Sequence, residues 1–181
     1  MSNFSSSFKR ITGVLTALAM ASLMAACATI TSSTPPQLAQ GEVVALLPIV
    51  NLTETPQAGA RAEAIVESLL QSGSGVSVKR FQGPVNRESL FQTVDREAVE
   101  QATAAARAAQ VKYGLTGSVQ EWRYKVGVDG EPAVGITLKL INLETGEVVW
   151  TATGSRTGWS RNAVSAIAQD LLGNLLTPLL R

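Results

Sequence analysis

The sequence predicts an α+β fold, in which about three helices pack on a mixed β-sheet that includes a three-stranded antiparallel meander. Two observations carry this prediction. Three strand-like runs follow one another between residues 113 and 155, separated by short turn sequences. Apolar residues recur at helical spacing in three other segments, so that each can bury one face against a sheet. The predicted order of elements is β-α-β-α-β-β-β-α, which is typical of an α+β domain.

The first half of the domain is predicted to alternate between strand and helix. Val43–Val50 is an apolar run rich in β-branched residues, as expected of a buried strand. Thr55 should cap a helix that ends at the next glycines, and alternation over Val76–Phe81 predicts a second strand. Asp95 should cap an alanine-rich helix through Gln110, because alanine is the best helix former.

The second half is predicted to contain three consecutive strands and a final helix. The strands should span Tyr113–Val126, Ala133–Asn142 and Glu147–Ser155. Asp-Gly and Thr-Gly dipeptides in the two connections are turn signals, so the three strands should form an antiparallel meander. Ser160 should cap the last helix, whose apolar stripe ends before Pro178.

The N-terminal segment has the three parts of a bacterial export signal. Two cations, Lys9 and Arg10, precede an apolar run that ends at Ala26, and Cys27 follows small residues. This sequence resembles the lipobox of bacterial lipoproteins, in which the cysteine thiol receives a diacylglycerol and the chain is cut before it. An uncleaved membrane span is the alternative, but the apolar run is shorter than the ~20 residues that cross a bilayer.

The chain is therefore divided into three parts. Residues 1–26 are predicted to be a signal peptide, residues 27–41 a lipidated cysteine with a flexible tether, and residues 42–181 a single α+β domain. The tether prediction rests on a segment rich in Ser, Thr and Pro that carries no charge. Because Ala28 rather than Asp follows the cysteine, the usual bacterial sorting pattern predicts the outer membrane, with the domain at its periplasmic face.

The composition argues against an enzyme and against nucleic-acid binding. The chain has no histidine, and its one cysteine is assigned to the lipid, which removes cysteine–histidine metal sites, cysteine nucleophiles and histidine bases. No metal and no cofactor is expected beyond the covalent lipid on Cys27. Two of the 15 basic residues lie in the signal peptide, which leaves 13 against 14 acidic residues. This balance gives no basic excess for nucleic acid.

Trp159 lies between the last predicted strand and the last predicted helix, with Arg156 and Arg161 close to it in the sequence. A tryptophan flanked by cations suits a membrane–water interface, where the ring fills the headgroup region and the cations meet lipid phosphates. A tryptophan folded back over the helix terminus is the alternative. The sequence does not decide between these two interpretations.

The connection between the first two strands of the meander carries two acids, Asp129 and Glu131. A solvated hairpin tip is sufficient to explain them, because turn residues are commonly polar. If many copies of the chain stood in a ring, however, these acids would form a negatively charged collar that attracts a cationic polymer.

Four segments of the mature domain resemble a known family. They are LPIVNLTETPQAG at residues 47–59, EWRYKVG at residues 121–127, DGEPAVG at residues 129–135 and SRTGWS at residues 155–160. On these motifs the chain resembles the PelC family, the outer-membrane lipoproteins of Pel exopolysaccharide secretion. The resemblance covers most of the mature domain.

The resemblance implies more than the residues show. PelC-like proteins form a dodecameric ring below a PelB-like outer-membrane β-barrel porin, and the ring steers cationic exopolysaccharide towards the barrel for the biofilm matrix. A tryptophan of the family contacts membrane lipid, a role that falls on Trp159 here. The first choices for polymer-steering acids are Asp129 and Glu131, followed by Glu121.

Two other functions remain open. Related lipoproteins activate cell-wall synthases, so a regulator that binds a periplasmic enzyme is the second hypothesis, and such a protein can act as a monomer. A pore-forming subunit like the curli-secretion channel is the third. It would need membrane-spanning hairpins with an apolar outer face, where Arg123, Lys125 and Lys139 are difficult to place.

Overall fold

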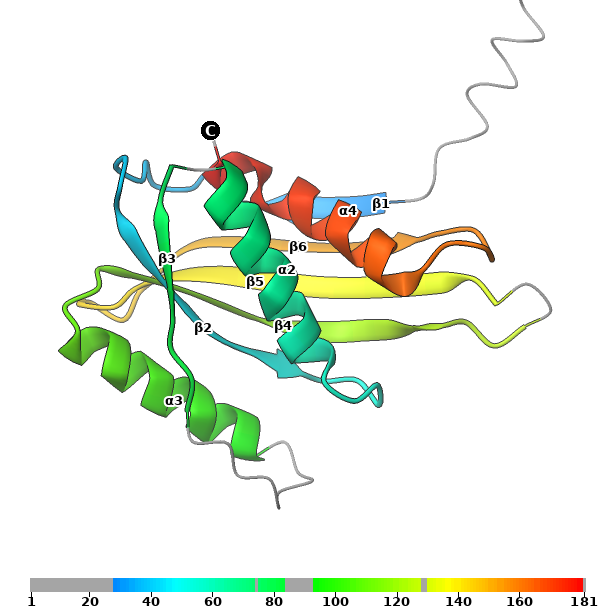
Figure 1. Cartoon of the computed structure of the whole chain (residues 1–181), viewed down its shortest axis with the longest axis horizontal. Helices are drawn as coiled ribbons and strands as arrows, with labels where there is room; N and C mark the ends of the chain where they lie inside the picture. Colours follow the sequence, from blue (N-terminus) through cyan, green and yellow to red (C-terminus); the bar gives the residue numbers. More distant parts are fainter. Residues whose placement is uncertain (1–27, 74, 84–92, 128–129, 181) are drawn as a thin grey trace, which may run out of the picture.

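A six-stranded mixed β-sheet forms the centre of the fold in the computed structural model of the chain (Figure 1). The structure describes residues 28–73, 75–83, 93–127 and 130–180. The strands are β1 (Ala28–Ser32), β2 (Val43–Asn51), β3 (Ser77–Arg80), β4 (Tyr113–Tyr124), β5 (Pro132–Asn142) and β6 (Val148–Thr157). The helices are α2 (Ala58–Gly73), α3 (Thr93–Ala108) and α4 (Val164–Leu176), and a short 3-10 helix, η1 (Thr177–Leu179), follows α4.

The order of strands across the sheet is β1-β6-β5-β4-β2-β3. β4, β5 and β6 form the predicted antiparallel meander, and β2 pairs in parallel with β4 on one side and with β3 on the other. β1 pairs antiparallel with β6 at the edge of the sheet. The predicted α+β class and the order of its eight elements are therefore confirmed, and β1 is an additional strand before them.

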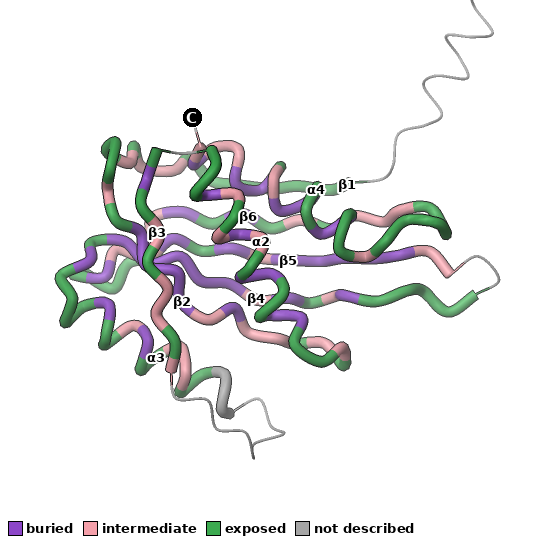
Figure 2. The backbone as a smooth tube through the Cα atoms, viewed as in Figure 1, coloured by how far each residue is buried: buried purple, intermediate pink, exposed green. Residues whose placement is uncertain are grey.

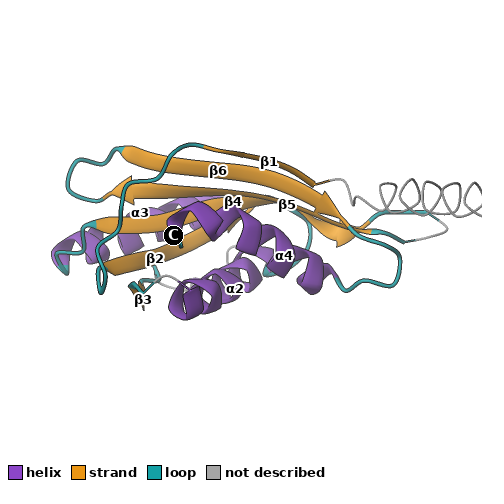
Figure 3. Ribbon diagram, turned by 90° about the horizontal axis from the view of Figure 1, so that it is seen from above, coloured by secondary structure: helices purple, strands orange, loops and turns teal. Residues whose placement is uncertain are grey.

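Helices cover both faces of the sheet unequally. α2 and α4 lie on one face, which we call the inner face, and α3 lies on the opposite, outer face beside β2 (Figure 3). β2 accordingly buries both of its faces: Val44 and Leu46 belong to the inner cluster, whereas Ala45 and Leu47 pack with alanines of α3. This explains why β2 reads as a continuous apolar run rather than an alternating one.

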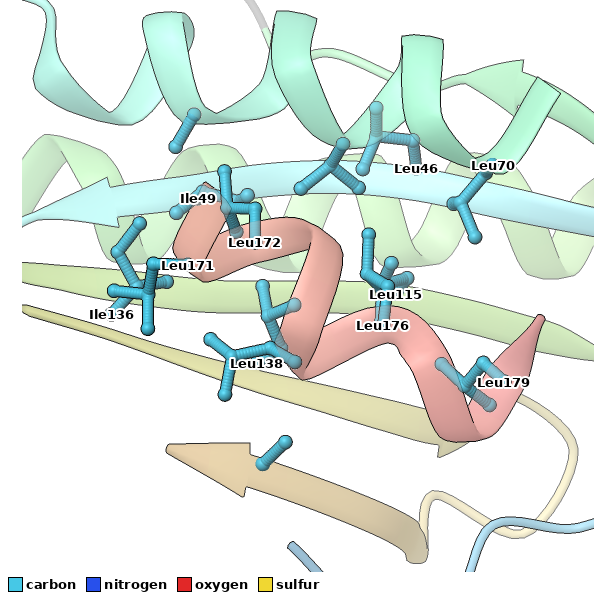
Figure 4. Close-up of a cluster of buried hydrophobic side chains, with 14 of the residues drawn as sticks. Leu46, Ile49, Leu70, Leu115, Ile136, Leu138, Leu171, Leu172, Leu176 and Leu179 are labelled. Atoms are coloured by element: carbon cyan, nitrogen blue, oxygen red, sulfur yellow. The ribbon is translucent and has the colours of Figure 1, made fainter. Parts of the chain in front are cut away.

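The inner cluster holds most of the buried apolar side chains. Leu171, Leu172 and Leu176 of α4 point towards the sheet, where they meet residues such as Leu138 of β5 and Leu115 of β4 (Figure 4). The buried segments in Figure 2 follow the middle strands, whereas β1 is exposed along its whole length. The outer face is thus left open where α3 does not reach, over the part of the sheet nearest β1.

A proline interrupts β2, and a buried carboxylate compensates for the irregularity. The register between β2 and β4 shifts between Leu46 and Ile49, on either side of Pro48. The backbone N–H of Ile49 donates to Oε1 of Glu63 at 2.9 Å, and the hydroxyl of Thr116 donates to the carbonyl of Pro48 at 2.7 Å. Glu63 is 8% exposed, so it fixes α2 against the sheet from within the fold.

The three predicted helix caps are wrong. α2 begins at Ala58, and the hydroxyl of Thr55 donates instead to the carbonyl of Trp122 in β4. α3 begins two residues before Asp95. α4 begins at Val164, four residues after Ser160, and its N-cap has no side-chain hydrogen bond. Thr55 has a tertiary partner in β4, and the turn closed by Trp159 and Asn162 delays the start of α4, so neither polar residue caps its helix.

The N-terminal region differs from the predicted tether. Ala28–Ser32 form the regular strand β1, because Thr29, Ile30 and Thr31 favour an extended backbone and the edge of β6 offers hydrogen bonds. The predicted signal peptide and Cys27 lie outside the described residues. Within the part of the chain that the structure describes, none of the helices combines the length and apolar character of a membrane span.

Candidate functional site

Two parts of the chain that are distant in the sequence, the β4–β5 hairpin and the loop after β6, meet at one end of the sheet. The end of β4 and the start of β5 lie there, together with the loop from β6 to α4 (Figure 1). The N–H of Gly158 in that loop donates to the carbonyl of Pro132 at 2.9 Å. β1 begins at the same end, since Ala28 lies opposite Arg156 in the register with β6. We call this region the hairpin end and define it by Ala28, Tyr124, Val126, Glu131 and Trp159.

Trp159 is held at the hairpin end by its backbone, not by its ring. Its N–H donates to Oδ1 of Asn162 at 2.7 Å, and its carbonyl accepts the N–H of Asn162 at 2.8 Å. These two bonds close a turn just before α4. The residue is 68% exposed, so most of the indole faces solvent.

Two further exposed side chains lie at the hairpin end, and the sequence analysis did not select them. Tyr124 is 51% exposed, and its hydroxyl donates to the carbonyl of Asn162 at 3.3 Å. Val126 is 98% exposed, directly after the end of β4. The sequence predicts a strand that continues through Val126 and pairs it in the sheet, whereas β4 ends at Tyr124 and leaves Val126 in solvent. Val126, Tyr124 and Trp159 thus give the hairpin end three exposed apolar or aromatic side chains.

The two predicted cationic neighbours of Trp159 differ in their surroundings. Nη2 of Arg156 lies 3.6 Å from Oδ2 of Asp170 on α4, so this cation is directed to the inner face and balanced by an acid. Arg161, in contrast, is exposed in the loop beside Trp159. Only Arg161 is therefore placed to meet an external anion next to the indole.

The predicted polymer-steering acids have cationic neighbours within the chain. Glu131 lies 3.8 Å from Nζ of Lys125 across the hairpin, and Oε1 of Glu121 lies 3.0 Å from both Nε and Nη2 of Arg123. Asp129 falls outside the described residues. An isolated copy of the hairpin thus contributes less negative charge than its count of acids suggests.

Among the residues that the structure describes, no group of three or more acids could hold a metal ion. The geometry at the hairpin end offers a surface rather than a reactive centre: an exposed indole, an aliphatic tip, a tyrosine and one uncompensated cation. Such a surface suits contact with a membrane interface or with a partner protein.

The comparison with solved structures decides the family. A single-residue variant of the PelC dodecamer from Paraburkholderia phytofirmans is 42% identical, covers 85% of this chain and 99% of that chain, and superposes with a TM-score of 0.73. A second crystal form of the PelC dodecamer from the same organism gives 42% identity, 85% and 98% coverage and a TM-score of 0.72. This chain belongs to the PelC family.

The other comparisons agree with a PelC-type fold. The family model described as the peptidoglycan-synthase activator LpoB matches residues 15–155, more than half of the chain, and so includes PelC-like proteins in that wider family. Lipoprotein GNA1162 from Neisseria meningitidis shares the fold at 16% identity, with a TM-score of 0.55 and coverage of 75% of this chain and 96% of that chain. A search of curated protein sequences found no match.

The predicted resemblance to PelC is therefore confirmed, and the protein is a Pel-related lipoprotein of the cell envelope. The matched proteins are described as an assembly and as an activator of another enzyme, which agrees with the prediction that the chain is not itself an enzyme.

Proposed function

We propose that this protein is an outer-membrane lipoprotein that forms a ring at the periplasmic face and guides cationic Pel-type polysaccharide to an outer-membrane β-barrel porin. The observation that carries the proposal is the position of Ala28. This residue follows the predicted lipidation site, Cys27, and lies at the same end of the sheet as Trp159.

The position of Ala28 determines how a lipidated chain would meet the bilayer. Ala28 already pairs with Arg156 of β6, so a diacylglycerol on Cys27 would lie within one residue of the folded sheet. The hairpin end must then face the membrane. Its exposed side chains, Trp159 and Val126, would enter the headgroup region, and Arg161 would meet lipid phosphates.

A ring of many copies would supply the concentrated negative charge that a single copy lacks. The related PelC structures are dodecamers, which supports a homo-oligomer of the same size here. Because Glu131 and Glu121 have cationic neighbours, one chain would attract a polycation weakly. Repetition of Asp129, Glu131 and Glu121 at the membrane-facing end of a ring would sum their potentials into one negatively charged collar. Steering of the polymer by this collar requires no fitted contact.

The experiment combines the mass of the lipidated protein in detergent with export of polysaccharide by cells. A ring predicts a particle of about twelve copies, and the membrane orientation predicts that Val126→Ser reduces export. Val148→Ser is the matched control, because Val148 is 52% exposed at the start of β6, at the opposite end of the sheet. A monomer in detergent, or equal export by the two variants, would refute the proposal.

A second candidate function is the activation of a peptidoglycan synthase, which the LpoB family model favours. A regulator of this kind would bind its enzyme as a single copy and would leave polysaccharide export unchanged when deleted. Stimulation of a purified synthase by the monomeric lipoprotein is the measurement that supports this alternative over the ring.

A further inference from the structure

A groove crosses the outer face of the sheet, away from the exposed side chains of the hairpin end. Its volume is about 990 Å³, within the range of ligand-binding clefts. The floor is made by β4, β5 and β6, one rim by β1, and the other rim by the loop that follows β2. That loop contains the segment Leu52–Pro56, part of a motif for which the ring function gives no role.

A β-bulge shapes the floor of the groove. The pairing of β4 with β5 shifts between Val119 and Glu121, so that Gln120 is the extra residue and neighbours Glu121 on the lining. Gly135 of β5 lies opposite Glu121 in the register and leaves the floor open. A Cβ atom on Gly135 would lie 3.4 Å from Cβ of Glu121, in space that now belongs to the groove.

The polar groups of the floor are already oriented. Nε2 of Gln120 donates to the hydroxyls of Ser118 and Thr137, both at 2.9 Å, and the hydroxyls of Thr137 and Thr153 are 2.8 Å apart. This chain of bonds crosses three strands and holds its members in one arrangement. Gln120 and Thr153 of this chain of bonds line the groove, together with the hydroxyl side chains of Thr29, Thr31, Thr53, Thr55 and Ser155.

The charged groups of the groove leave a net negative charge. Arg123 binds Oε1 of Glu121 through two nitrogens, so both contacts use one carboxylate oxygen of a residue that lines the groove. Glu54, on the opposite rim, is exposed and makes no ion pair with any described residue. Leu52 is 47% exposed beside it and supplies a small apolar surface.

We propose that this groove binds a segment of an amino-sugar polysaccharide. The carboxylates of Glu54 and Glu121 receive its ammonium groups, and the hydroxyl side chains exchange hydrogen bonds with its hydroxyl groups. Leu52 contacts the apolar face of a sugar ring. We assign this ligand because the hydroxyl groups of the lining match the hydroxyl groups of a sugar, and the excess negative charge of the lining matches its ammonium groups.

The proposal rests on the proposed function, because that function brings such a polymer to the protein, but it adds a direct contact to long-range steering. A lipid surface would need exposed apolar side chains, which lie at the hairpin end instead. A protein partner would favour a more apolar and aromatic lining than this row of hydroxyls.

The test measures binding of a glucosamine hexamer to the mature lipoprotein in detergent by calorimetry at low salt. Glu54→Gln removes the unpaired charge without changing the size of the side chain. It should weaken binding about tenfold, the effect of losing one charge-assisted contact. Glu97→Gln is the matched control, since Glu97 is an exposed acid on α3 outside the groove, and it should leave the affinity unchanged. The neutral N-acetylglucosamine hexamer should bind more weakly than the glucosamine hexamer.

Gly135→Val provides an independent test that alters shape without altering charge. It should also weaken binding, because the new side chain fills the floor beside Glu121. Unchanged binding by both groove variants would overturn the proposal, as would an equal loss in Glu97→Gln, which would indicate unspecific attraction. A change in particle mass with Gly135→Val and no change in binding would instead assign the groove to contact between copies. If the parent protein binds the hexamer but forms no ring, or if its deletion leaves polysaccharide export unchanged, only the proposed function would be overturned.

Discussion

Replacement of Trp159 by alanine should separate membrane contact from folding. The indole is 68% exposed, and the hydrogen bonds that close its turn use backbone atoms and Asn162 rather than the ring. Exposed side chains without buried partners contribute little to stability, so the free energy of unfolding should change by no more than about 0.5 kcal/mol.

The expected loss of membrane affinity follows from the exposed area. A tryptophan side chain can bury about 250 Å², of which the exposed fraction here is about 170 Å². Full transfer of that area is worth about 4 kcal/mol, and insertion to headgroup depth about half of this, or about 2 kcal/mol. Each copy should therefore lose about thirtyfold in partition between water and membrane. In a ring the losses of the copies combine, and binding should fall further.

The assay must remove the lipid, because a diacylglycerol would hide the contribution of the side chain. The mature chain with Cys27→Ser should be mixed with vesicles of zwitterionic and anionic phospholipid, and the bound fraction measured by sedimentation. Val148→Ser serves as the control at the opposite end of the sheet, where no membrane contact is expected. If Trp159→Ala binds as well as the parent, or if Val148→Ser loses as much, the orientation inferred from Ala28 is wrong.

Three stability predictions test the packing that places the hairpin end. Glu63→Ala should lower the free energy of unfolding by about 2 kcal/mol in urea titrations, because the N–H of Ile49 loses its buried acceptor. Glu67→Ala is the control: it removes a partly buried ion pair with Arg80 and should lower the free energy of unfolding by less than about 1 kcal/mol. Gly59→Ala should be strongly destabilising in the same titrations, since its Cβ would lie 2.0 Å from the carbonyl oxygen of Ile49 and would push α2 from the sheet. Gly173→Ala in α4 should raise the thermal midpoint by stabilising the helix by roughly 0.5–1 kcal/mol, because a Cβ there meets nothing within 4 Å; an unchanged or lower midpoint would contradict this.

The strands and helices could be predicted because their burial patterns are local. In β5, Val134, Ile136, Leu138 and Leu140 face the inner cluster, as the alternation of the sequence indicates. β2 reads as a continuous run because helices cover both of its faces. Helix boundaries could not be predicted in the same way. The hydroxyl of Thr55 has a better partner in β4 than at the helix terminus, and no local pattern reveals that partner.

The candidate site was predicted in part. Trp159 could be selected because a tryptophan in a polar loop lacks an obvious core position, and the structure places it at an exposed turn. Val126 could not, because it continues a strand pattern that the backbone ends two residues earlier. The ion pair of Arg156 with Asp170 could not be predicted from the sequence either, since it depends on how α4 packs against β6.

β1 changes the expected role of the lipid anchor. A flexible tether would let the domain rotate, and the membrane would then select no particular face. With Ala28 paired in the sheet, a lipid on Cys27 would allow little rotation, and in the proposed arrangement the fold itself would bring the hairpin end and the bilayer together. The groove on the outer face begins at the same strand, through Thr29 and Thr31. In the proposed arrangement, an anchor that orients one end of the sheet would also set the direction of the groove, from the periplasm towards the membrane. That is the direction in which an exported polymer must travel.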